Sequence, residues 1–189
     1  NITGNTSIVT LGTIATGIWN GTIVTAEKGG NKLVSKNYTP VSNAADTAEL
    51  LLHSHQIAAA IVGAGDMLEI YSSWLETASV FNKTYRFYVN TSNTLVGATL
   101  IGTLISSGAA IAVDSIQRYI PVINDTTFEM LCGATSSYRS SFGTGGGTSA
   151  NVTVPSVSAG FWILISGQKA IAGETLTCRW SMVRLNKTS

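Results

Sequence analysis

Apolar side chains recur at every second residue along much of the chain, and this period limits the possible folds most. The alternation runs through residues 68–74, 85–89 and 176–182. Successive side chains of a β-strand point to opposite faces, so a period of two predicts strands with one buried face. The predicted inward-facing residues are Leu68, Ile70, Ser72 and Trp74, then Tyr85, Phe87 and Val89, and finally Leu176, Cys178, Trp180 and Met182.

Turn-forming residues separate the predicted strands. Short strands at this spacing, with almost no helical periodicity, are typical of an antiparallel β-sandwich or barrel. Residues 44–60 are rich in Ala and Leu and also allow a helix. We predict a strand there, entering the sandwich. The predicted turns are Asn82-Lys83, Asn90–Asn93, Asn124-Asp125, Gly143–Gly147 and Ala172-Gly173.

The first 45 residues have a different character. Residues 11–22 and 28–30 are rich in Gly and Thr and contain few large apolar side chains. A segment that buries so little cannot offset the conformational entropy lost on ordering. We therefore expect residues 1–45 to order only against other copies of themselves or against a neighbouring domain.

Low charge excludes several classes of partner. Charged residues make up 11% of the chain, the formal net charge is +1, and the Lys and Arg residues are scattered singly. Nucleic-acid binding requires a concentrated basic face, so we expect no nucleic-acid partner. The longest apolar runs, residues 57–62 and 161–165, are far shorter than the roughly 20 residues of a membrane-spanning helix, so we expect no membrane insertion.

Two cysteines, Cys132 and Cys178, are too few for a disulfide framework or a four-cysteine metal site within one chain. Both follow apolar neighbours, which favours free, buried thiols that pack as small hydrophobic groups. A bridge between the two is the alternative.

Residues 11–22, Leu-Gly-Thr-Ile-Ala-Thr-Gly-Ile-Trp-Asn-Gly-Thr, resemble the element LGTIATGxWxGT of bacteriophage tail-fibre and minor structural proteins. In that family the element forms part of an intertwined trimeric β shaft or collar. Looser similarity to the receptor-binding domain that follows such shafts runs through residues 65–74, 82–87, 163–168 and 174–183. Residues 97–125 depart from the family pattern.

The resemblance implies a short shaft or collar over residues 1–45 and a distal, jelly-roll-like β-sandwich over residues 46–189. It also implies a homotrimer in the virion, joined to an upstream fibre shaft and to other virion proteins. The implied function is adhesion to the host cell, through a surface glycan or a protein receptor. Three sites on one tip would raise avidity without any one of them binding tightly.

His53-Ser54-His55 is the sharpest candidate metal site. Residues two apart on a strand point the same way, so three chains could direct six imidazoles at a common axis. Some tail fibres hold an axial metal with such pairs, but in the thin shaft, whereas the neighbours Leu50–Leu52 and Ile57 belong to a predicted sandwich strand. Ordinary histidines at a surface or subunit interface are the favoured interpretation, and no cofactor is expected.

Motifs for catalysis are missing from the sequence. The acidic residues are isolated, Gly-x-Ser-x-Gly does not occur, and no Lys-Ser/Thr pair follows the glycines at 145–147. We expect a binding protein that is not an enzyme. A purely structural collar, baseplate or decoration trimer is the main alternative, and a polysaccharide depolymerase with carboxylates that converge in space is the other.

Residues 135–151 form the predicted recognition hairpin. Tyr138, Arg139 and Phe142 are its bulky side chains among Ser and Gly. Binding loops often combine rigid aromatic anchors with small, adaptable polar residues. We predict that the two rings stack on a sugar while Arg139 donates hydrogen bonds. The alternative is a solvated loop whose aromatic side chains cover the end of the sandwich.

Overall fold

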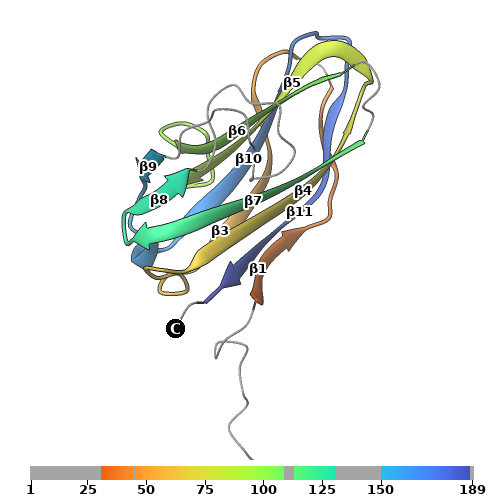
Figure 1. The fold of residues 1–189 in the computed structure, drawn as a ribbon. Helices are drawn as coiled ribbons and strands as arrows, with labels where there is room; N and C mark the ends of the chain where they lie inside the picture. Colours follow the sequence, from red (N-terminus) through yellow and green to blue (C-terminus); the bar gives the residue numbers. More distant parts are fainter. Residues whose placement is uncertain (1–30, 45, 109–112, 131–149, 188–189) are drawn as a thin grey trace, which may run out of the picture.

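The computed structural model describes residues 31–44, 46–108, 113–130 and 150–187 (Figure 1). Within these ranges the chain forms strands and a single turn of 3-10 helix, η1 (Val157–Ala159). The strands are β1 (Asn31–Asn37), β2 (Val41–Asn43), β3 (Leu50–Ile57), β4 (Met67–Glu76), β5 (Ser79–Asn90), β6 (Thr99–Gly108), β7 (Val113–Asn124), β8 (Thr127–Met130), β9 (Ala150–Thr153), β10 (Phe161–Lys169) and β11 (Leu176–Asn186).

Two antiparallel sheets pack face to face. The larger has the order β1-β11-β4-β7-β8-β9, with β2 also pairing with β11, and the smaller has the order β3-β10-β5-β6. Every strand pairing in the described part of the chain is antiparallel. The predicted all-β class and antiparallel sandwich are therefore confirmed.

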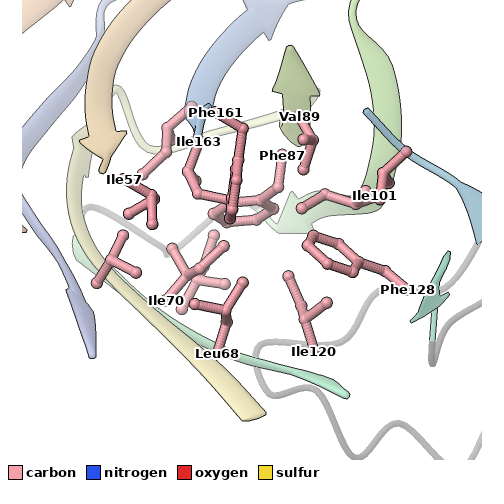
Figure 2. Close-up of a cluster of buried hydrophobic side chains, with 14 of the residues drawn as sticks. Ile57, Leu68, Ile70, Phe87, Val89, Ile101, Ile120, Phe128, Phe161 and Ile163 are labelled. Atoms are coloured by element: carbon pink, nitrogen blue, oxygen red, sulfur yellow. The ribbon is translucent and has the colours of Figure 1, made fainter. Parts of the chain in front are cut away.

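Apolar side chains from both sheets fill the space between them (Figure 2). The predicted inward face of residues 85–89 is confirmed, since Tyr85, Phe87 and Val89 are fully buried. Phe128 of β8 and Phe161 of β10 meet edge to face across the core, with ring centroids 5.9 Å apart. Aromatic pairs favour this geometry because the positive edge of one ring meets the negative face of the other.

A β-bulge in β11 changes which side chains point inward. The register with β4 shifts between Cys178 and Trp180. An extra residue in one strand reverses the alternation beyond it. After the bulge Ser181 and Val183 are buried, and Trp180 is only half-buried. The prediction that Trp180 and Met182 share the inward face of Leu176 and Cys178 is therefore wrong, because the strict period of two assumed an unbroken strand.

The turn predicted at Asn82-Lys83 is also wrong. Both residues lie inside β5, where the register with β6 shifts between Ser79 and Lys83, and the chain reverses earlier, at Thr77-Ala78. The Lys83 side chain is buried and its ammonium group forms an ion pair. The turns predicted near Asn90–Asn93, Asn124-Asp125 and Ala172-Gly173 do connect strands, and the Gly143–Gly147 turn lies outside the described residues.

Strands β1 and β2 lie one after the other along the same edge of β11. Residues 38–40, which include Pro40, interrupt them opposite the bulge at Arg179. The last part of the segment predicted as a shaft thus contributes two edge strands to the larger sheet, while residues 1–30 lie outside the described residues. The strand predicted within residues 44–60 is confirmed as β3.

Cys178 is a free thiol in the core, and burial raises its pKa. The prediction of a free, buried thiol is confirmed for Cys178, and Cys132 lies outside the described residues. Among the helical residues that the structure describes, none belongs to a helix long and apolar enough to cross a membrane.

Candidate functional site

The outward face of the smaller sheet carries a row of polar and aromatic side chains. On β10 the inward-facing residues Phe161, Ile163 and Ile165 belong to the core. The alternate residues Trp162, Leu164, Ser166 and Gln168 share the outward face, where Leu164 and Ser166 are fully buried. Cross-strand partners share a face, which places Arg86 of β5 beside Ser166. Arg86 and Tyr88 are half-buried, as their alternation with Tyr85, Phe87 and Val89 predicted.

Glu49, just before β3, contacts side chains of β5 and β10 on this face. Its carboxylate pairs with the Arg86 guanidinium at 3.0 Å and accepts hydrogen bonds from the hydroxyls of Tyr88, at 2.8 Å, and Ser166. Arg86 also donates to the Gln168 side chain at 2.9 Å. We call these five residues the Glu49 cluster.

Burial, the hydrogen bond to Glu49 and the charge of Glu49 together raise the pKa of Tyr88 to about 12. The phenol therefore stays protonated at neutral pH and donates to the carboxylate. Side chains held in such a network lose little conformational freedom when a ligand binds, which favours affinity.

A pocket of about 140 Å³ opens at the edge of the same sheet, where β3 ends and β10 begins. Trp162, which is half-buried, forms part of its wall, and Gln56 lies directly across from Trp162 on β3. None of the lining side chains is charged. The lining residues are Gln56, Ile57, Ala58, Ala59, Thr91, Ala159, Gly160, Phe161 and Trp162.

Gly160 shapes this pocket through its backbone. Its φ of 82° and ψ of 153° belong to a region that residues with a Cβ rarely enter. A Cβ at this position would lie 3.0 Å from the Ala59 backbone nitrogen, so the two segments can approach this closely only because residue 160 is glycine.

The outward face of the larger sheet carries a second aromatic and polar group. Tyr71 donates to Glu69 at 2.9 Å, Gln117 donates to Tyr71 at 2.7 Å, and Gln117 also bonds the Tyr119 hydroxyl. The Arg184 guanidinium lies 5.5 Å from the centre of the Tyr71 ring. This surface is the main alternative to the pocket face as a binding site, but none of its residues lines the 140 Å³ pocket.

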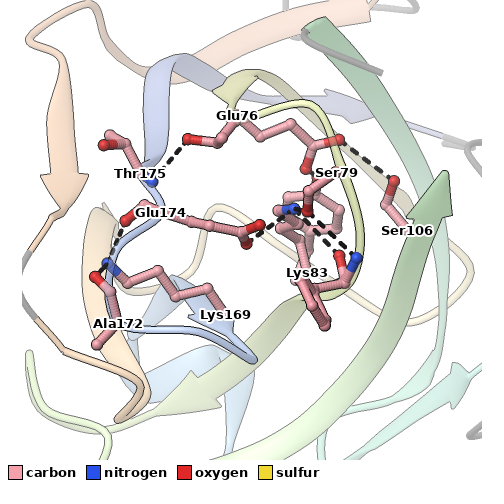
Figure 3. Close-up of polar contacts among 11 residues, drawn as sticks. Glu76, Ser79, Lys83, Ser106, Lys169, Ala172, Glu174 and Thr175 are labelled. Carbon is pink, nitrogen blue, oxygen red and sulfur yellow. Dashed lines mark hydrogen bonds and ion pairs between the residues drawn. The ribbon is translucent and has the colours of Figure 1, made fainter. Parts of the chain in front are cut away.

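A buried polar network joins the β4–β5 and β10–β11 connections, which pass between the two sheets at one end of the sandwich (Figure 3). Lys83 pairs with Glu174 at 2.9 Å and donates to Ser79 at 2.7 Å, and Lys169 donates to the backbone oxygens of Ala172, at 3.1 Å, and Glu174. Burial raises the pKa of Glu174, but hydrogen bonds from Ser79 and Lys83 and the positive charges of Lys83 and Lys169 outweigh it, so the net shift is downward.

Glu76 lies in the same network and accepts hydrogen bonds from Tyr85 and, at 3.3 Å, from Ser106. Burial raises its pKa, and the Tyr85 hydrogen bond and the Lys83 charge only partly oppose that rise. Glu76, Lys83 and Lys169 are each at most 5% exposed. The network therefore supports the fold and is not presented to a ligand.

The histidines predicted at a surface or subunit interface are in fact buried inside the chain. His53 and His55 are each 1% exposed and point from β3 toward β11. That part of the prediction is wrong, because the inward-facing positions of β3 include both histidines. All four ring nitrogens have hydrogen-bond partners within the chain. Where the structure describes the chain, no three His, Cys, Asp or Glu side chains gather as metal ligands.

The predicted recognition residues Tyr138, Arg139 and Phe142 lie outside the described residues, so the hairpin stays a prediction. Sequence reasoning did not single out Trp162 or Glu49. Trp162 lies inside the continuous apolar run 161–165, which hides its outward direction. Glu49 reaches the sheet only through contacts with β5 and β10, about 40 and 120 residues away along the chain. The outward positions of Arg86 and Tyr88 were the one available signal.

The fold and this face together define a β-sandwich with a half-buried tryptophan beside a small uncharged pocket. No family model and no curated protein matches the chain. Among solved structures, the CBM2 module of the evolved Dit of Lactobacillus casei BL23 phage J-1 aligns over 86% of this chain and 99% of its own, with 9% identity and a TM-score of 0.38. A chain from the structure of infectious bursal disease virus Gx strain aligns over 82% of this chain and 40% of its own length, with 10% identity and a TM-score of 0.27. Likenesses this weak carry no conclusion about function.

Proposed function

We propose that the chain is the receptor-binding end of a bacteriophage tail fibre, which holds a host-surface glycan without catalysing a reaction. The observation that carries the glycan part is Trp162 at the 140 Å³ pocket, on the same outward face of the smaller sheet as the Glu49 cluster. The phage part is supported by the resemblance of residues 11–22 to the shaft element.

A sugar ring suits such a site chemically. Its C–H face packs on an indole, and its hydroxyls exchange hydrogen bonds with amides and with the backbone. The Gln56 side chain and Thr91 are exposed at the pocket and offer donors and acceptors. Because no lining side chain is charged, we propose an uncharged sugar residue for the pocket.

We also propose that the sandwich is a jelly roll and that three chains assemble around one axis. The order β1-β11-β4-β7 in one sheet and β3-β10-β5-β6 in the other supports a jelly-roll arrangement, because successive strands cross repeatedly between the sheets. Three chains around one axis would let the Gly- and Thr-rich residues 1–30 share strands and would place three pockets on one tip.

The experiment is adsorption of the full chain to host cells and to isolated envelope polysaccharide, comparing Trp162→Ala with Trp180→Ala. Both tryptophans are half-buried, but Trp180 belongs to β11 of the larger sheet. We expect about a 2- to 12-fold loss of binding for Trp162→Ala and little change for Trp180→Ala, because one stacked aromatic ring contributes about 0.5–1.5 kcal/mol.

Loss of binding in Trp180→Ala alone would move the site to the larger sheet. Loss only in a Tyr138→Ala, Arg139→Ala, Phe142→Ala triple variant would move it to the predicted hairpin. Failure of the unmodified chain to adsorb would favour a structural virion protein. New reducing ends after incubation with polysaccharide would indicate a depolymerase.

A further inference from the structure

His53 and His55 form one hydrogen-bonded chain with three partners from other segments. The Ser181 hydroxyl lies between the rings, 2.6 Å from His53 Nδ1 and 2.8 Å from His55 Nε2. At the ends, His53 Nε2 lies 2.8 Å from the Thr39 carbonyl oxygen and His55 Nδ1 lies 2.9 Å from the Ser35 hydroxyl. The chain thus links β3 to β11, to β1 and to the β1–β2 connection.

Proton positions follow from these partners when both rings are neutral. A carbonyl oxygen only accepts, so His53 Nε2 carries its hydrogen and His53 Nδ1 accepts from Ser181. The Ser181 oxygen then accepts from His55 Nε2, and His55 Nδ1 accepts from Ser35. Both rings are Nε2-protonated tautomers, and every donor in the chain points toward Thr39.

An added proton fits this arrangement poorly. A doubly protonated His53 would direct a second N–H at Ser181, whose oxygen already accepts from His55 and whose own hydrogen would lose its acceptor. No compensating carboxylate lies on the surrounding strands, since β1, β2, β3, β10 and β11 contain no Asp or Glu. Their charged residues are Lys32, Lys36, Lys169, Arg179 and Arg184.

The nearby Lys and Arg side chains do not stabilise a charged imidazole either, because their charges have the same sign. Lys32 pairs with Leu185 and so lies on the inward side of β1, and its charge has the same sign as that of an imidazolium. Lys36, Arg179 and Arg184 lie on the outward sides of β1 and β11, and Lys169 belongs to the buried network at the β10–β11 connection. Cys178 is the other ionisable group facing inward from β11, and burial keeps its thiol protonated.

We propose that the chain Ser35–His55–Ser181–His53–Thr39 is an acid-sensitive latch that holds residues 31–43 on the sandwich. While both imidazoles are neutral the latch is closed. Protonation drives the two edge strands off β11, because only the opened segment lets water reach the charged rings. Lowered pKa values of both histidines, with burial as the main cause and His55 at about 4, agree with this geometry.

Hydrogen exchange of the full chain at pH 7 and pH 5, corrected for intrinsic rates, tests the proposal. We expect opening of residues 31–43 to become about 25-fold more favourable at pH 5 than at pH 7 for each histidine that titrates with a normal pKa of about 6.5 only in the open state. Residues 83–90 of β5 should stay protected, which separates local opening from global unfolding.

Two variants complete the test. His53→Gln with His55→Gln should remove the pH dependence, while Ser181→Ala should raise opening at pH 7 but keep that dependence. If the double variant does not fold, each single variant should lose part of the effect. Nitrogen NMR of the unmodified chain should show the Nε2-protonated tautomer for both rings at pH 7. Nδ1 protonation, titration near pH 6.5 in the closed state, or unchanged protection of residues 31–43 at pH 5 would overturn the latch.

Discussion

Lys83 illustrates, at the scale of a single residue, how this chain buries a charge. Its ammonium group is satisfied by the Ser79 hydroxyl, the Phe81 carbonyl and the Glu174 carboxylate. A buried ion pair often contributes little net stability relative to an apolar pair, but removing one partner leaves the other charge uncompensated. The network therefore makes the sandwich sensitive to changes that break its pairing.

Replacing Lys83 by Met should lower the free energy of unfolding by about 3–5 kcal/mol, because Glu174 then loses its closest buried cation. Urea denaturation measures the loss. Adding Glu174→Gln should recover part of the stability, and Lys36→Met, at an exposed position on β1, should cost under about 1 kcal/mol. Equal losses at Lys83 and Lys36 would show that the ion pair is not important for stability.

Gly160 permits a second test at this scale. Gly160→Ala should cost about 1–3 kcal/mol, because alanine disfavours the observed φ and ψ, and its Cβ would press on the Ala59 backbone at the pocket. Thermal unfolding measures the cost. Gly173→Ala is the matched control, since a Cβ there meets nothing within 4 Å. A neutral Gly160→Ala would mean that the pocket wall adapts easily.

At the scale of the element, the bulge in β11 decides which side chains enter the core. Deleting Met182, which lies beyond the bulge, would shift the alternation by one residue and turn Val183 and Leu185 outward. Exposing these two side chains should lower the free energy of unfolding by about 3–6 kcal/mol. Thermal unfolding followed by circular dichroism should then show a broadened transition or none. Arg179→Ala keeps the extra residue and should be nearly neutral. A stable deletion variant would show that the strand can slip without penalty.

The same element shows what the sequence can and cannot predict. Period-two alternation located β4, β5 and β11 because burial on one face leaves a direct mark on the residues. The bulge leaves no such mark, since a strict alternation continues through Cys178, Trp180 and Met182 in the sequence, and only the pairing with β4 shows the extra residue. Trp162 and Glu49 were missed for a related reason: their roles arise from contacts between strands distant in sequence.

At the scale of the whole molecule, global stability should depend on pH through the two histidines. Their pKa values are lowered in the folded state, so the unfolded chain binds more protons as the pH falls. The stability that the neutral histidines contribute is therefore fully present above about pH 6.5 and is lost as the pH falls toward 4. Relative to the His53→Gln, His55→Gln variant, the unmodified chain should lose about 2 kcal/mol between pH 7 and pH 5 from His55 alone. Denaturant titrations at pH 7, 6 and 5 measure the difference, and parallel curves for the two proteins would contradict it.

The proposed assembly predicts a mass in solution of three times the 19.8 kDa chain, measurable by light scattering. If three pockets act together, binding to a dense glycan surface should exceed binding to a soluble single-site glycan by about two to four orders of magnitude. A monomeric mass at micromolar concentration, or equal affinity for both ligands, would contradict multivalent adhesion.

Asn31 and Asn186 are cross-strand partners at one pole of the sandwich, so residues 31–186 begin and end side by side (Figure 1). A unit with adjacent ends needs a gap of only about one strand spacing, roughly 5 Å, in whatever carries it. It can be inserted into a surface loop of an unrelated carrier protein without strain at either junction. Exchange of binding specificity between carriers would then require replacing one compact insert, with the carrier's own architecture left intact.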